Sequence, residues 1–90
     1  MKLYKLYIGH NNKTKKRFQE SIINNIINNY FEGFTIIKSE GFYKSECEQS
    51  YIIEILTKNQ EKIKNLKSEL LNTLEQESIL LTTTNLEVEF

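Results

Sequence analysis

Several residue types are missing or rare in this 90-residue sequence. It has no proline, alanine, aspartate or tryptophan, and it has one cysteine, one histidine and three glycines. A lone cysteine cannot form an internal disulfide, which favours a reducing compartment, and one cysteine with one histidine cannot complete a Cys/His zinc site. The three glycines lie far apart, which excludes the glycine-rich loops that bind ATP or dinucleotides. We therefore expect neither a metal nor another cofactor.

An excess of charge of one sign is also lacking, because twelve lysines and arginines balance twelve acidic residues. A general nucleic-acid-binding protein normally needs a basic excess to neutralise phosphates, so nucleic acid is not an expected partner. Residues 1–9 alternate apolar and basic side chains and lack the long apolar block of a signal peptide or membrane span. These features predict a cytoplasmic protein without membrane contact. The frequent isoleucine, asparagine and lysine are typical of AT-rich genomes, including those of phages and plasmids.

The remaining composition is that of a small globular protein. With 39% apolar and 27% charged residues, the chain lies outside the range of disordered sequences. A chain of 90 residues is long enough for one domain with a thin core, so we expect a single domain over residues 1–90.

The first half of the chain reads as strand, helix, strand. Apolar residues alternate over 2–8, which predicts a strand, and a loop follows at 10–13. Over 14–30 apolar residues recur every four positions, with asparagines between them, which predicts an amphipathic helix. Gly33 lies just past its end, and the β-branched run 34–38 predicts a second strand.

The second half repeats this order. A hairpin with a long charged tip over 44–49 should lead into a central strand at 51–56. Thr57 and Gln60 resemble a capping box that would begin a second helix, and 78–90 should form the last strand. The apolar stripe of the second helix consists of Ile63, Leu66, Leu70 and Leu74.

This β-α-β-β-α-β order predicts an α+β fold of the ferredoxin-like type. Right-handed crossovers favour a four-stranded antiparallel sheet with both helices on one face and with the first and third strands in the middle. The face of the sheet without helices would then carry a large apolar surface, which is unfavourable in water. We therefore expect this face to form a homodimer interface. Cover by the chain's own loops is the alternative, and an RNA platform is disfavoured because Glu54 repels phosphate. The predicted interface comprises Leu3, Lys5, Tyr7, Ile52, Glu54 and Leu56.

A basic run precedes the first predicted helix, at the end where the helix dipole disfavours cations. It could bind a phosphate or an acidic partner, or it could be a solvated charge run. The candidate anion-binding residues are His10, Lys13, Lys15, Lys16 and Arg17.

The sequence offers no convincing catalytic group. His10 and Cys47 could act as base and nucleophile, but nothing in their spacing brings them together. The glutamates of the hairpin region, Glu40, Glu46, Glu48 and Glu54, lack a visible apolar pocket that would raise the pKa of one of them. We therefore name no catalytic residue.

Four short segments, residues 6–9, 32–35, 41–43 and 76–80, together resemble an uncharacterised family of small bacterial proteins with a ferredoxin-like domain of unknown function. The resemblance implies the fold and no activity. If such a family has a site, Tyr43, Gln76 and Glu77 are candidates, although Gln76 and Glu77 could simply close the second helix and open the last strand.

Three functions are therefore weighed. The first is a non-catalytic binding module that self-associates through its sheet and inhibits a host protein on behalf of a phage or plasmid. The second is a sensor or sequestering protein for a small anionic, nucleotide-like ligand held at the basic run. The third is a small enzyme of unknown reaction.

Overall fold

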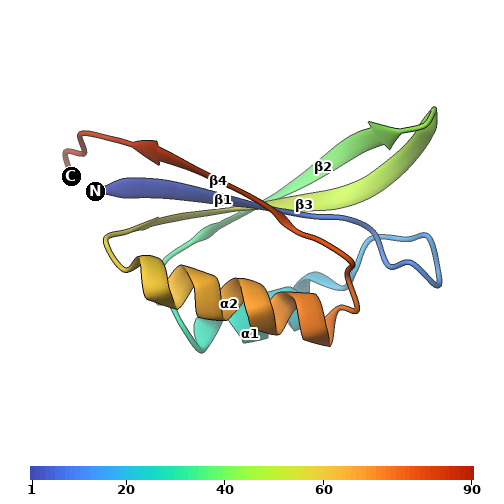
Figure 1. Ribbon diagram of the computed structural model, residues 1–90, viewed down its shortest axis with the longest axis horizontal. Coiled ribbons are helices and arrows are strands. Elements are labelled where there is room, and N and C mark those ends of the chain that lie inside the picture. Colours follow the sequence, from blue (N-terminus) through green and yellow to red (C-terminus); the bar gives the residue numbers. More distant parts are fainter.

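The computed structural model, which describes every residue except the side chain of Tyr43, has the predicted order of elements. Two helices lie together against one face of a twisted sheet, and the β2–β3 hairpin projects beyond the rest of that sheet (Figure 1). The elements are β1 (Lys2–Ile8), α1 (Glu20–Asn28), β2 (Thr35–Tyr43), β3 (Glu46–Thr57), α2 (Gln60–Thr73) and β4 (Leu80–Asn85).

The sheet has the strand order β2-β3-β1-β4, and every neighbouring pair is antiparallel. The central position of β1 and β3 and the placement of both helices on one face confirm the predicted ferredoxin-like α+β fold. The longer helix, α2, has 14 residues, so no helix in the described part of the chain is long and apolar enough to cross a membrane.

The core lies between the sheet and the two helices. Burying one such side chain contributes about 1.5–3 kcal/mol. Every member of the predicted α2 stripe is buried, which confirms that stripe. The fully buried residues are Leu6, Ile8, Ile53 and Ile55 of the sheet, Ile23 and Ile27 of α1, and Ile63, Leu66 and Leu70 of α2.

The first helix is shorter than predicted, because it begins at Glu20 instead of residue 14. Asn11 organises the preceding residues into a loop: its side-chain oxygen accepts hydrogen bonds from the amides of Lys13 and Thr14, at 2.8 and 3.2 Å. Lys15 has a φ of 59°, in the left-handed region that ends a helix. The basic run therefore lies in a loop and not at the amino end of a helix, which corrects the predicted setting.

The β2–β3 hairpin is longer and its turn is tighter than predicted. Lys44 and Ser45 form a two-residue turn with φ values of 51° and 65°. Positive φ at both central positions is typical of turns whose twist matches that of the flanking strands, so pairing continues to the tip. The predicted charged loop 44–49 is therefore wrong, and Glu48 belongs to a strand.

Two other element ends also differ from prediction. The side chain that caps α2 is Asn59, whose oxygen accepts from the Lys62 amide at 3.0 Å, and not Thr57. The last strand ends at Asn85 instead of residue 90. Asn85 pairs with Lys2, the first residue of β1, and beyond this pair the Leu86 amide donates to the Met1 carbonyl oxygen at 3.0 Å.

Candidate functional site

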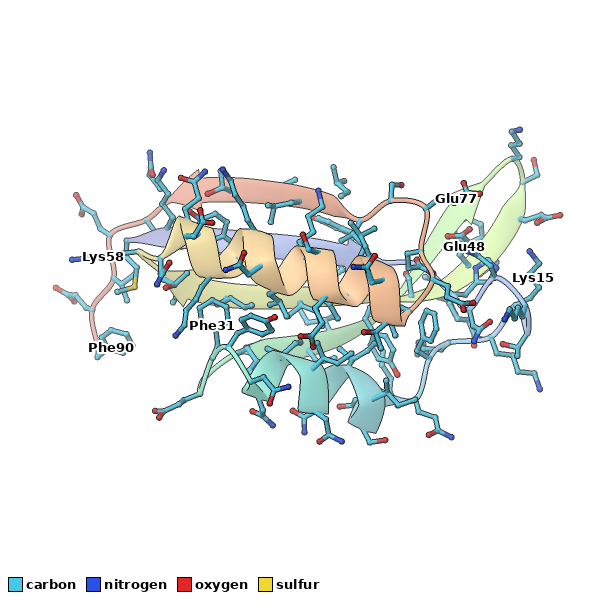
Figure 2. The ribbon with its side chains drawn as sticks, turned by 60° about the horizontal axis from the view of Figure 1, so that its bottom comes forward. Lys15, Phe31, Glu48, Lys58, Glu77 and Phe90 are labelled. Atoms are coloured by element: carbon cyan, nitrogen blue, oxygen red, sulfur yellow. The ribbon has the colours of Figure 1, made fainter. Side chains whose placement is uncertain are left out.

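A cleft of about 760 Å³ lies where β1 ends, beside the projecting β2–β3 hairpin. Its walls come from the end of β1, the loop that follows, the hairpin, and the connection between α2 and β4. Lys15, Glu48 and Glu77 belong to three of these segments, and Figure 2 shows them at the same end of the molecule. The fold thus places Lys15 and Glu77, which are 62 residues apart in the sequence, in the wall of one cleft.

His10 is the buried polar residue of this cleft. Only 9% of its surface is exposed, and its Nδ1 lies 3.5 Å from Glu48 Oε1. Among the described residues, neither ring nitrogen of His10 has a hydrogen-bond partner. A buried polar group without a partner costs about 1–3 kcal/mol, and such a group in a native protein calls for an explanation.

Gly9 allows three cleft residues to approach each other closely. A Cβ at this position would lie 3.2 Å from Gln76 Oε1 and 3.4 Å from Glu48 Oε2. Gln76 also donates a hydrogen bond from Nε2 to the His10 carbonyl oxygen at 3.2 Å. The connection after α2 is therefore tied directly to the backbone that presents His10.

The structure gives different environments to the five predicted anion-binding residues. His10 and Lys15 line the cleft. Lys13 forms an exposed ion pair with Glu75 at 3.2 Å, and Lys16 is exposed outside the cleft lining. The binding of an anion by these residues stays a prediction.

Arg17 has a different role, because it ties the loop to the hairpin. Its guanidinium donates to the carbonyl oxygens of Ser50 and Ser39, at 3.2 and 3.0 Å, and lies 5.6 Å from the centre of the Tyr51 ring. Tyr51 in turn donates to the Phe18 carbonyl oxygen at 2.7 Å. Burial raises the pKa of Tyr51, and Glu20 raises it further, while Arg17 lowers it.

The predicted interface residues lie side by side on the open face of the sheet. They form three cross-strand pairs, and the central pair, Lys5 and Glu54, makes an ion contact of 3.6 Å. Ile37 of β2 and Leu80 of β4, which the sequence analysis did not include, widen this surface because they pair with Ile52 and Tyr7. The outer two pairs are Leu3 with Leu56 and Tyr7 with Ile52.

His10 and Cys47, which were weighed as base and nucleophile, are not brought together in the cleft. Cys47 is exposed and pairs with Phe42, and strand alternation turns it away from the face that carries Glu48. Gln76 and Glu77 both line the cleft, whereas the side chain of Tyr43 lies outside the described residues. Over the described side chains, no group of three His, Cys, Asp or Glu residues could hold a metal ion.

The sequence analysis weighed Glu48 among the hairpin glutamates and set it aside because no apolar pocket was visible, and it placed residues 44–49 in a loop. The two-residue turn instead extends β3 and sets Glu48 opposite Gly41, with its carboxylate at His10. The available signal was alternation: Glu46, Glu48 and Ser50 continue the spacing of the outward residues Ile52 and Glu54. Lys44 and Ser45 lack the usual glycine of such turns, so the sequence predicted the hairpin but not its tight turn.

No protein-family model matches this chain, and no curated protein matches it. Solved structures do match. A phage SAM lyase in its apo state aligns with a TM-score of 0.71 at 19% identity, over 92% of this chain and 78% of that chain. A DUF3240 family protein from Shewanella baltica OS155 has a TM-score of 0.66 at 12% identity, over 99% of this chain and 93% of that chain.

A third solved structure is CPII, a PII-like nitrogen regulatory protein from Thiomonas intermedia K12, bound to ADP, AMP and bicarbonate. It aligns with a TM-score of 0.62 at 15% identity, over all of this chain and 96% of that chain. At these identities the likeness concerns the fold. The DUF3240 neighbour is consistent with the predicted resemblance to a domain of unknown function. This chain thus has the fold of a set of small ferredoxin-like proteins.

Proposed function

We propose that this chain is a ligand-binding module whose cleft takes a small, nucleotide-like molecule. One observation carries this proposal: the buried His10 imidazole has no hydrogen-bond partner among the described residues, and it lies in the cleft wall. A ligand that bonds to this ring would remove the cost of leaving it unpaired.

The size and lining of the cleft support this proposal. Small-molecule sites typically enclose 300–1,000 Å³ and combine an apolar wall with a few polar groups, and this cleft has about 760 Å³. Tyr7 and Leu80 provide an apolar wall on which a flat ring can pack. The names of two solved structures of similar fold mention adenosine-containing molecules: one protein is bound to ADP and AMP, and the other is a SAM lyase.

Isothermal calorimetry with adenosine nucleotides and nucleosides tests this proposal. We expect at least one compound to bind, and His10→Leu to weaken it by tenfold or more, because the ring bond is lost. At a hundred times its dissociation constant, the ligand should add about 2.7 kcal/mol to the free energy of unfolding. Lys16→Ala, outside the cleft, is the control and should change nothing. If no compound binds, the proposal fails.

The second candidate function is self-association through the open face of the sheet. The specific observation is its pattern, an opposite charge pair flanked by apolar pairs. A two-fold axis parallel to the strands, midway between β1 and β3, would set Lys5 of one copy opposite Glu54 of the other. The same axis would bring the apolar pairs of the two copies into contact. Such self-complementarity is what a symmetric dimer interface requires.

Light scattering of the full chain tests this second proposal. We expect a dimer, and we expect Leu56→Glu to make it monomeric because a charge would be buried in the interface. Ile22→Glu is the matched control, since Ile22 on α1 is 42% exposed and Leu56 is 39% exposed. A wild-type monomer at high concentration overturns the proposal. Inhibition of a host protein and a small enzyme activity stay predictions.

A further inference from the structure

The cleft lining contains more acidic than basic side chains. Glu48, Glu77 and Lys15 line it, and within the described part of the chain no lysine or arginine pairs with either glutamate and no acidic group pairs with Lys15. With His10 neutral, the lining carries a formal charge of minus one. A free phosphate or a nucleoside diphosphate, with two or more negative charges, would therefore be repelled on balance.

The groups around His10 also offer hydrogen-bond acceptors to a ligand. A neutral imidazole has one donor and one acceptor. The carboxylate of Glu48 lies next to Nδ1 of His10, so it favours the proton on Nδ1 and leaves Nε2 as an acceptor. One of the two N–H donors of the Gln76 amide is already used by the His10 carbonyl oxygen. The carboxylates of Glu48 and Glu77 and Nε2 of His10 are therefore acceptors left for a ligand, and their natural complement is a donor.

We propose that the ligand of this cleft carries a protonated amino group, bound by Glu48, Glu77 and Nε2 of His10. An ammonium offers three donors and a positive charge, which match these three acceptors and the negative lining. Lys15, on the loop that also carries His10, would receive a carboxylate of the same molecule, so an amino acid moiety fits best. Figure 2 shows Glu48 on the hairpin and Glu77 before β4, at the same end of the molecule as Lys15. This inference rests on the proposed ligand-binding function.

Two adenosine thioethers provide a matched pair of probes. S-adenosylhomocysteine carries an amino acid group, and methylthioadenosine is the same nucleoside without it. In calorimetry with the full chain we expect S-adenosylhomocysteine to bind about tenfold more tightly or better, as a charge-assisted bond allows. Glu48→Gln and Glu77→Gln should each weaken S-adenosylhomocysteine about tenfold and change methylthioadenosine less than twofold. Glu87→Gln, an exposed carboxylate outside the cleft, is the control and should leave both affinities unchanged.

Two outcomes distinguish this inference from the function on which it rests. Methylthioadenosine or AMP binding as tightly as S-adenosylhomocysteine, with no loss in either glutamine variant, overturns the amino-group inference and leaves the ligand site intact. If none of the three compounds binds, the proposed function fails, and the inference fails with it.

Discussion

The two connections that lead from a central strand into a helix differ sharply. Between β3 and α2 the connection is two residues, and the side chain of Asn59 caps the helix. Between β1 and α1 it spans residues 9–19, and Gln19 at the helix start makes no side-chain cap hydrogen bond. The long connection carries His10 and Lys15, which line the cleft, and Arg17, which anchors the loop to the hairpin, so the two connections differ in what their side chains contact.

The largest stability effect should come from removing the contact that anchors the long connection. Arg17→Ala loses two hydrogen bonds and a stacking contact with Tyr51, and we expect unfolding by urea to report a loss of about 2 kcal/mol. Lys16→Ala, the neighbouring exposed residue, should stay within about 0.5 kcal/mol of wild type. Equal stability of the two variants would show that Arg17 does not anchor the loop.

Tyr51 should make the same anchor sensitive to alkali. Its raised pKa means that the folded state favours the neutral phenol, so this contribution is fully present below pH 10, its ordinary pKa, and is lost as pH rises through the folded value. Tyr51→Phe should cost about 1 kcal/mol at neutral pH, because the Phe18 carbonyl oxygen loses its donor.

Urea unfolding at neutral and alkaline pH measures both effects of Tyr51. Stability should fall less above pH 10 in Tyr51→Phe than in wild type, because the phenol that would have to ionise is gone. Identical slopes against pH in the two proteins would contradict this account.

Asn59→Ala should cost about 1 kcal/mol in thermal or urea unfolding, because the amide of Lys62 loses its cap. Asn65→Ala is the matched control: Asn65 is exposed within α2, and alanine there should stabilise by a few tenths of a kcal/mol. If Asn65→Ala lowered stability as much as Asn59→Ala, the loss at Asn59 could not be attributed to the helix cap.

The smallest effect should come from giving α1 the cap that it lacks. Gln19 has an extended backbone, with φ of −64° and ψ of 128°, as a capping residue needs. Gln19→Asp should therefore stabilise the protein by about 0.5 kcal/mol, by accepting from the first-turn amides and favouring the helix dipole. Calorimetric melting of the two proteins measures this, and an unchanged or lower melting temperature would rule out a missing cap.

The order of elements could be predicted from local patterns, but the site could be predicted only in part. His10 and Lys15 were predicted from the basic run, and Gln76 and Glu77 from a resemblance, with no reason to place all four in one cleft. Glu48 was missed because residues without glycine form the tight turn, and turn geometry depends on pairing across the whole hairpin. The setting of the run was wrong because Asn11 hydrogen bonds outcompete the helix.

The sequence by itself determined the fold class, the stripe of α2 and the residues of β1 and β3 on the open sheet face, because apolar spacing fixes which side of a helix or strand is buried. Only the tertiary structure decided that His10 is buried beside Glu48, that Arg17 spans two strands, and that Gln76 reaches the backbone at His10. These contacts join segments distant in sequence, and short-range periodicity carries no information about which loop ends meet at one edge of a sheet.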